Sequence, residues 1–226
     1  MRMLVVFEKG SALRHIGHLD LMRTMQRILR RTSLPVAYSQ GFNPHMIVNF
    51  AAPLSVGASG LREIMDVSLA TEIAEDIFLS KLQEVLPPAL KAVAARAVAD
   101  QYPAPMSRLF SASYEICVID SSGKTLANTV PAFLERHEIP AMRKTKSGEK
   151  PCDIRPMIYQ LSVEEKDGSF IFHAVLAMRE EATCKPDLLM TSLSTMAQVP
   201  CPAYTLTRTG MLGKRLDGSI VPLESL

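Results

Sequence analysis

Arginine side chains at helical spacing are the residues of this sequence that most directly suggest chemistry. Arg23, Arg27 and Arg30 stand at positions i, i+4 and i+7, so a helix places them on one face, and Arg31 follows them. The planar guanidinium group of arginine matches the oxygens of a phosphate better than a lysine does. We expect these side chains to bind nucleic-acid phosphates. The alternative is a solvated helix face without a ligand.

A second candidate is the segment 38–45, which combines aromatic rings with hydrogen-bonding side chains. Rings stack on unpaired bases, and amide and imidazole groups read base edges, as on RNA-binding surfaces. The alternative is a polar turn without a ligand. The side chains that we expect to contact bases are Tyr38, Gln40, Phe42, Asn43 and His45.

Basic residues also gather in residues 143–150, between a predicted helix and a predicted strand of the second half of the chain. This segment contains Gly and Ser, and we expect a flexible loop whose cations clamp a phosphate. An ordinary solvated loop is the alternative. Arg155 follows and is expected to organise the RNA-binding surface of the second half. The cations of the loop are Arg143, Lys144, Lys146 and Lys150.

Histidines are the candidates for catalytic chemistry. His18 or His45 could act as a general acid or base in RNA cleavage, but positioning and hydrogen bonding are the expected roles. His15 and His18 straddle a predicted helix start without the His-x-x-x-His spacing of a helical metal site, so no metal is expected. The sequence also lacks a Walker-type glycine loop, a dinucleotide fingerprint and the Gly-x-Ser-x-Gly motif of esterases.

The elements that must position these residues follow from apolar periodicity. The first half predicts strands at 3–7, 47–50, 64–69 and 90–98 and helices at 17–31 and 72–85. This β-α-β-β-α-β order is typical of the ferredoxin-like arrangement, in which two helices cover one face of an antiparallel sheet.

The same order recurs after a linker that carries two prolines. The second half predicts strands at 113–119, 154–163, 170–178 and 204–208 and helices at 126–138 and 188–196. We therefore expect an α+β protein built from two tandem ferredoxin-like (βαββαβ) domains with antiparallel sheets. The expected boundaries are 1–100 for the first domain, 101–111 for the linker, 112–210 for the second domain and 211–226 for a C-terminal tail.

Composition and charge narrow the class of protein. The 226 residues are 47% hydrophobic and 21% charged, which excludes disorder as the main state. The net charge of +2 conceals an uneven distribution: residues 1–50 hold seven basic against two acidic groups, and residues 51–100 hold four against seven. The net values are therefore +5 and −3, so the small total does not argue against a nucleic-acid partner.

The expected location and cofactors follow from segments and motifs that the sequence lacks. No apolar run approaches the ~20 residues that span a bilayer, and the N-terminal segment meets charge too early for a signal peptide. The four cysteines form no Cys-x-x-Cys pair, so we expect no zinc ribbon, redox dithiol or iron–sulfur site within the chain. We expect a cytoplasmic protein with reduced thiols.

Residues 14–23, the string Ser-Gln-Gly-Phe-Asn-Pro-His at 39–45 and residues 153–156 resemble the radical SAM-linked protein family. This is a bacterial family of uncharacterised domains encoded beside, or fused to, B12-binding-type radical SAM proteins. The resemblance covers most of residues 1–210. Two departures stand out: Gly17 replaces the usual serine, and Met46 with Ile47 replaces a proline and a basic residue.

The resemblance implies a partner enzyme that supplies the radical chemistry. That partner is expected to carry an iron–sulfur cluster and S-adenosylmethionine, with cobalamin left open, whereas this chain holds no cofactor. The main hypothesis is an RNA-binding accessory protein that presents tRNA or rRNA to the radical SAM modification enzyme. The alternatives are a protein–protein adaptor that docks on that enzyme, and a metal-independent endoribonuclease that uses His18 or His45.

Overall fold

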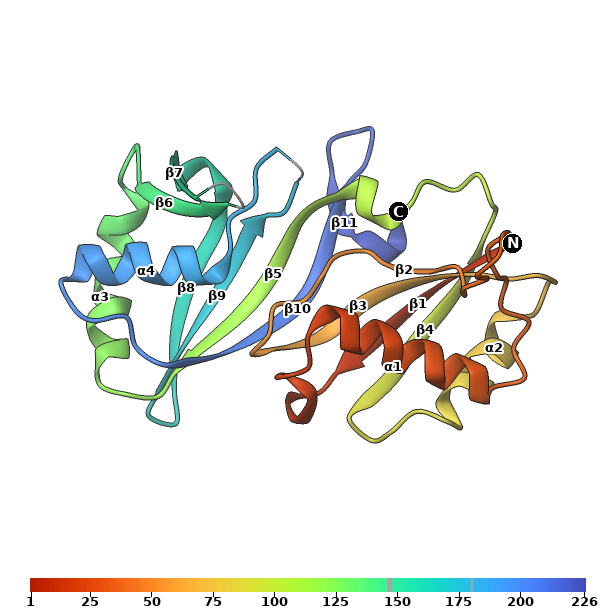
Figure 1. Cartoon of the computed structure of the whole chain (residues 1–226). Helices are drawn as coiled ribbons and strands as arrows, with labels where there is room; N and C mark the ends of the chain where they lie inside the picture. The colour runs from red at the N-terminus through yellow and green to blue at the C-terminus, as the bar shows by residue number, and fades with distance from the viewer. Residues whose placement is uncertain (146–147, 180) are drawn as a thin grey trace. The chain divides into compact units, whose positions relative to one another are not determined.

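The computed structural model of the chain describes residues 1–145, 148–179 and 181–226, which divide into two units (Figure 1). Unit 1 consists of Met1–Leu109 together with Gly210–Leu226, and unit 2 consists of Phe110–Thr209. Residues 211–226, expected as a tail, are therefore part of unit 1. Within the described ranges the protein is a mixed α+β structure with four α-helices, as the periodicity predicted.

Unit 1 follows the predicted order of elements. β1 pairs antiparallel with both β3 and β4, and β2 pairs antiparallel with β3, which gives the strand order β4-β1-β3-β2. The end of β10 and the short strand β11 (Ile220–Pro222) complete the unit. The main elements are β1 (Arg2–Lys9), α1 (His18–Arg31), β2 (Val48–Phe50), β3 (Ala58–Ser68), α2 (Glu75–Gln83) and β4 (Leu90–Val98).

Helix α1 forms because its apolar residues recur at helical spacing. Its buried residues are Leu21, Met25, Ile28 and Leu29. They belong to one hydrophobic cluster with Phe7 of β1 and residues of α2, so both helices cover the same core. The helix ends at Thr32, whose hydroxyl donates to the Leu29 carbonyl at 2.7 Å. The arginines therefore lie on a helix whose opposite face is fixed by packing.

The outer edge of β4 is covered by side chains of α2. Gln83 Nε2 donates to the Ala92 carbonyl at 3.0 Å, and Glu75 Oε1 accepts the Ala97 amide hydrogen at 2.7 Å. Unpaired strand edges invite pairing with other chains. These two contacts occupy polar groups of β4 that such pairing would need.

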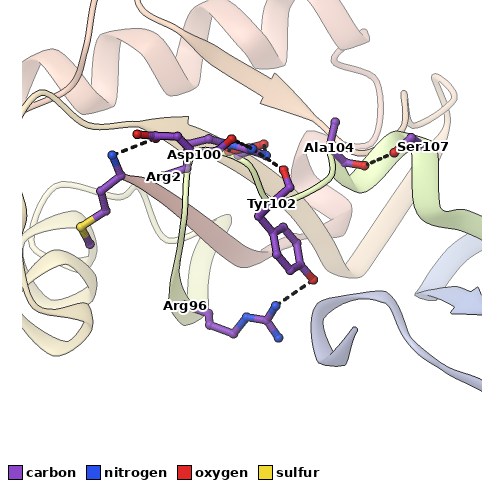
Figure 2. A network of polar contacts seen from close by, with 8 residues as sticks. Arg2, Arg96, Asp100, Tyr102, Ala104 and Ser107 are labelled. Atoms are coloured by element: carbon purple, nitrogen blue, oxygen red, sulfur yellow. Dashed lines mark hydrogen bonds and ion pairs between the residues drawn. The ribbon is translucent and has the colours of Figure 1, made fainter. Parts of the chain in front are cut away.

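The segment after β4, expected as a linker, is held by arginines (Figure 2). The Arg2 guanidinium forms a two-pronged pair with Asp66 of β3, with Nε to Oδ1 at 3.1 Å, and it also donates to the carbonyls of Asp100 and Tyr102. The Tyr102 ring lies 5.2 Å from the Arg96 guanidinium carbon and 5.6 Å from that of Arg108. This segment is therefore anchored to the sheet of unit 1.

Unit 2 has the element order predicted for the second half, with one added hairpin. β9 pairs antiparallel with both β5 and β8, and the strand order is β10-β5-β9-β8. Strands β5 and β10 each contain a boundary between the units. The elements are β5 (Leu109–Val118), α3 (Ser122–Leu134), β6 (Pro140–Thr145), β7 (Gly148–Asp153), β8 (Ile158–Lys166), β9 (Ser169–Ala177), α4 (Pro186–Ala197) and β10 (Tyr204–Lys214).

Two of the differences between the structure and the sequence prediction lie within residues 120–150 of unit 2. The described residues of the segment 143–150 do not form the expected flexible loop, because β6 and β7 pair antiparallel from Pro140↔Asp153 to Thr145↔Gly148. Helix α3 begins at Ser122 rather than at residue 126, because Asp120 Oδ1 accepts the Ser122 amide hydrogen at 2.9 Å. Both differences come from local backbone hydrogen bonding that apolar periodicity does not report.

Within residues 1–145, 148–179 and 181–226, none of the helices has the length and apolar content that a bilayer crossing requires.

Replacing Gly17 by serine should stabilise the protein. Gly17 is the N-cap of α1 with φ −71° and ψ 166°, and it lacks a side-chain cap. An added Cβ would meet Val56 Cγ2 at 3.8 Å, an ordinary contact. We expect Gly17→Ser to raise the free energy of unfolding in urea by about 0.5–1 kcal/mol. Gly17→Ala, which lacks the capping oxygen, should be about 1 kcal/mol less stable than Gly17→Ser. A serine variant less stable than wild type would contradict this.

Removing Arg2 should leave a buried, unpaired carboxylate. The Asp66 side chain is 7% exposed and that of Arg2 is 14% exposed. We expect Arg2→Leu to lower the free energy of unfolding by about 3–5 kcal/mol. The matched double variant Arg2→Leu/Asp66→Leu should recover at least half of that loss, because no unpaired charge remains. Equal losses in the two variants would show that the pair has no such role.

Candidate functional site

The arginine face predicted on α1 is present and open to solvent. Arg23, Arg27, Arg30 and Arg31 are all exposed. Arg23 Nη1 lies 3.2 Å from Asp20 Oδ1, but both side chains are about two-thirds exposed, so solvent screens this pair strongly. Arg30 and Arg31 stand in the last turn of α1, where cations also stabilise the helix dipole. The face can therefore accept phosphates from solvent.

The 38–45 loop is closed at its base and exposed at its tip. An isolated bridge joins Tyr38 to Met46, and the Ser39 amide donates to the His45 carbonyl at 2.8 Å. Phe42 is fully exposed and Tyr38 is 44% exposed. Gly41, beside Phe42, has φ +125°, a conformation that favours glycine. The loop thus presents aromatic rings to solvent on a defined base.

The remaining predicted loop residues share this exposure. Gln40 and Asn43 are exposed, as is His45. The Ser39 hydroxyl lies 2.9 Å from His45 Nδ1 and accepts the His45 amide hydrogen at 3.1 Å. These contacts fix the orientation of the imidazole ring.

His18 has a packing partner. Its ring is half-buried and meets the Phe50 ring edge to face, with 5.5 Å between the centroids. His15 is exposed and accepts a hydrogen bond from Arg14 Nε at 3.2 Å. In the part of the chain that the structure describes, no group of three or more His, Cys, Asp or Glu side chains is arranged to hold a metal ion.

Sequence reasoning missed the lysine that positions the start of α1. Lys9 is 1% exposed at the end of β1, and its ammonium donates to the carbonyls of Ile16 at 3.1 Å and Ala58 at 3.2 Å. The Arg14 carbonyl also accepts the Gly57 amide hydrogen at 2.8 Å. The segment that leads into α1 is therefore held against the start of β3. The signal that could have revealed it is the position of Lys9, two residues after Phe7, which places both side chains on the same face of the strand.

In unit 2, Arg143, Lys144 and Lys150 lie on the paired strands β6 and β7. Arg143 and Lys150 stand directly opposite each other, so their side chains share one face. Lys144 stands opposite Glu149 in the strand register, and Lys146 lies outside the described residues. Like charges placed opposite each other repel, and an anion between them relieves that cost.

Arg155 binds main-chain oxygens of its own unit. Its Nε donates to the Leu134 carbonyl at 3.1 Å and its Nη1 to the Ile158 carbonyl at 3.4 Å. It therefore joins the end of α3 to the start of β8. The predicted site residues thus fall into two sets: those on α1 and the 38–45 loop in unit 1, and those of 143–155 in unit 2.

A groove of about 1020 Å³ in unit 2 was not predicted. Residues of α4, the β6–β7 hairpin and the end of α3 line it, and Arg143 is the predicted site residue among them. Its walls are far apart in the sequence, so spacing could not reveal it.

The cysteines lack the features of a reactive centre. Cys184 is buried, and burial raises the pKa of its thiol to about 12, with nearby Cys152 adding to the shift. A protonated thiol is a poor nucleophile. Cys201 is exposed.

Comparison with known proteins gives a family and a fold. A family model described as "Uncharacterized protein conserved in bacteria (DUF2344)" matches residues 2–186. Among solved structures, a chain of a Cbf5–Nop10–Gar1 complex aligns with a TM-score of 0.50 and 10% sequence identity, over 92% of this chain and 48% of that chain. This likeness concerns the fold alone, and the present chain spans about half the length of the protein it matches. A search of curated proteins gives no match.

Thiol reactivity should separate the two cysteines. At pH 8 we expect iodoacetamide to modify Cys201 in the folded protein and to modify Cys184 only after unfolding. The raised pKa of Cys184 also means that its contribution to stability is complete below about pH 9 and falls as the pH rises toward 12. Cys184→Ala should flatten that alkaline decline in urea titrations. Equal modification rates for the two thiols in the folded protein would refute this assignment.

Proposed function

Since this chain belongs to the DUF2344 family of bacterial proteins, we propose that it is an RNA-binding accessory protein that presents tRNA or rRNA to a partner radical SAM modification enzyme. One observation carries the proposal: unit 1 exposes four arginines on α1 and a fully exposed phenylalanine, Phe42, at the tip of the 38–45 loop. In this proposal the partner supplies the iron–sulfur cluster and S-adenosylmethionine.

The arginines and the loop would contribute different parts of the binding energy. Arginine contacts to phosphates release counterions, which gives affinity that falls steeply with salt. Stacking of an unpaired base on Phe42 or Tyr38 would add about 1–3 kcal/mol per base, with little dependence on salt. Gln40, Asn43 and His45 lie within the same loop and could hydrogen-bond base edges.

The pair Arg143 and Lys150 supports a further phosphate contact in unit 2. The two side chains share one face of the hairpin, where a phosphate would relieve their mutual repulsion. Arg155 would act indirectly, since its contacts to Leu134 and Ile158 hold the backbone from which the hairpin returns to β8.

We also propose that both units are ferredoxin-like variants. The strand orders β4-β1-β3-β2 and β10-β5-β9-β8 each place the first and third strands of a βαββαβ series at the centre. The hairpin β6–β7 would then be an insertion between the first helix and second strand of unit 2.

The proposed radical SAM partner rests on the resemblance of residues 14–23, 39–45 and 153–156 to the radical SAM-linked family. Asp153, within the last of these segments, accepts the amide hydrogens of Ile139 at 2.8 Å and Arg155 at 2.9 Å. This motif therefore has a structural role at the base of the hairpin. The exposed segments in unit 1 are the ones free to contact a substrate.

RNA binding can be tested with a labelled, unstructured oligoribonucleotide and with bulk tRNA in filter-binding assays at low salt. We expect Phe42→Ala to weaken binding about 5- to 100-fold, because a stacking ring is lost. Arg27→Glu should weaken binding and reduce the slope of log affinity against log salt by about 0.7 for single-stranded RNA.

Arg215→Glu is the matched control, because it makes the same charge change at an exposed position of unit 1 outside α1. It should leave both affinity and salt slope close to wild type. Absence of RNA binding at low salt, or equal effects of Arg27→Glu and Arg215→Glu, would rule out the proposed function. The RNA should also remain intact, since the role proposed for His18 and His45 is not catalytic.

A further inference from the structure

The groove of unit 2 has two walls of different kinds. One wall is α4, and the other is the β6–β7 hairpin. The rest of the lining consists of Phe133, Arg136, Glu138, Ile139, Thr183 and Lys185. Its volume of about 1020 Å³ lies at the top of the ~300–1,000 Å³ range of small-molecule pockets. An occupant of this groove can therefore be larger than a typical metabolite.

The wall formed by α4 is a single helical stripe. Apart from Asp187 near the start of the helix, the α4 positions that line the groove follow the spacing i, i+3, i+4, i+7 and i+8, so they share one face. The residues between them, such as Leu189, Met190 and Leu193, are buried on the opposite face. The stripe carries hydroxyl groups between two apolar ends and consists of Leu188, Thr191, Ser192, Thr195 and Met196.

The wall formed by the hairpin is the outer edge of β6. Four consecutive residues, 140–143, line the groove. Successive side chains of a strand point to opposite faces, so only the edge of a strand can present all four to one groove. Figure 1 agrees, since β6 lies between β7 and α4, and α4 packs near β6. Over the described residues, β6 and β7 form a two-stranded sheet, so nothing pairs with this edge.

The register of the hairpin places main-chain groups on that edge. Met142 stands opposite Pro151, which has no amide hydrogen to donate. The two residues therefore form a non-hydrogen-bonded pair, and the amide and carbonyl of Met142 point away from β7. These groups have the spacing and direction that pair with another extended backbone.

We propose that this groove binds an extended peptide segment of a partner protein, which adds a third strand to β6 and packs its side chains against α4. Main-chain hydrogen bonds to the edge would give affinity, and the groove would select side chains. The groove lies outside α1 and the 38–45 loop and shares only Arg143 with the residues proposed to contact RNA, so the peptide proposal does not depend on the RNA proposal.

The charges favour a peptide over a nucleic acid. Among the described residues that line the groove, the cations are Arg136, Arg143 and Lys185, and the carboxylates are Glu138, Glu149 and Asp187. This balance contrasts with the arginine face of α1, and it suits a segment that carries charges of both signs. A polyanion would meet the three carboxylates.

The apolar residues define the anchor that the peptide must supply. Phe133 is 1% exposed and Ile139 is 6% exposed, whereas Met142 is 51% exposed. Methionine side chains adapt to different partners, and aromatic or aliphatic anchors dominate the energy of peptide sites. We expect the segment to direct at least one large apolar side chain toward Met142 and Met196, the large apolar lining residues that are exposed.

The test uses the full-length protein and peptides selected from a displayed library of random 12-residue sequences. The selected peptide is labelled and titrated by fluorescence anisotropy against wild type, Met142→Pro and Met142→Ala. Met142→Pro removes the outward amide hydrogen at a position where the hairpin does not use it, and Met142→Ala removes the side chain alone. We expect Met142→Pro to weaken binding at least ten-fold and distinctly more than Met142→Ala.

Two further measurements keep the result independent of hairpin folding. In the first, single backbone amides of the peptide are N-methylated in turn. Methylation should abolish binding where the amide faces β6 and leave binding unchanged at the neighbouring residues. Thr195→Trp, which fills the groove from α4 without changing the hairpin, should also weaken binding at least ten-fold. Thr195 is not among the residues proposed to bind RNA, so Thr195→Trp should leave RNA affinity unchanged, and failure of the groove and failure of the RNA site are distinguishable.

Several outcomes would overturn the proposal. No selected peptide, or selected peptides that bind all variants equally, would exclude an edge-pairing site in this groove. An oligoribonucleotide that displaces the peptide from the wild-type protein but not from Thr195→Trp would assign the groove to nucleic acid. If the wild-type protein dimerises with increasing concentration in sedimentation experiments and Met142→Pro does not, the groove would be assigned to a second copy of this chain.

Discussion

The buried ion pair between Arg2 and Asp66 is the interaction on which unit 1 depends. It joins β1 to β3, and Arg2 also holds the segment that follows β4 through the Tyr102 carbonyl. Asp66 stands opposite Asn49 in the register between β2 and β3, so the residue that pairs with Arg2 also lies beside the strand that follows the 38–45 loop. The exposed loop thus rests on strands whose alignment a buried charge specifies. A slip of one residue would leave that charge unpaired, which is a strong constraint on register.

The sequence predicted the helices and strands that form because apolar residues recur at regular spacing and are buried. Helix α1 was placed closely because its apolar stripe and its arginines repeat at the same helical spacing on opposite faces. The hairpin β6–β7 was missed because its strands are rich in charge and proline and bury little, so they lack an alternating apolar pattern. Its pairing depends on hydrogen bonds and on Gly148, the first residue of β7, whose φ of +116° favours glycine. The expected boundaries of unit 1 likewise omitted residues 210–226, because pairing across the sequence leaves no local signal.

The candidate sites also differ in how much of each could be predicted from the sequence. The residues of α1 and the 38–45 loop could be named from their types, and exposure of Phe42 and the arginines agrees with the proposed role. Spacing could not reveal that Lys9 holds the approach to α1, or that Arg155 is engaged by carbonyls of Leu134 and Ile158. The groove depends on a strand edge and a helix that are more than forty positions apart in the chain. Local patterns identify side chains, whereas the tertiary fold decides which of them are committed to structure.

Unit 2 is inserted within the chain of unit 1, and this has a consequence for biosynthesis. Glu224 accepts a hydrogen bond from Arg62 at 2.7 Å, and its carbonyl accepts one from Arg96 at 2.8 Å, so the last residues close unit 1. A ribosome delivers the N-terminal part of unit 1 first, then all of unit 2, and then the segment that completes unit 1. Unit 2 can therefore fold as an uninterrupted stretch while unit 1 waits with part of its sheet unpaired. During that interval the nascent chain would lack the contacts that Glu224 makes with Arg62 of β3 and Arg96 of β4.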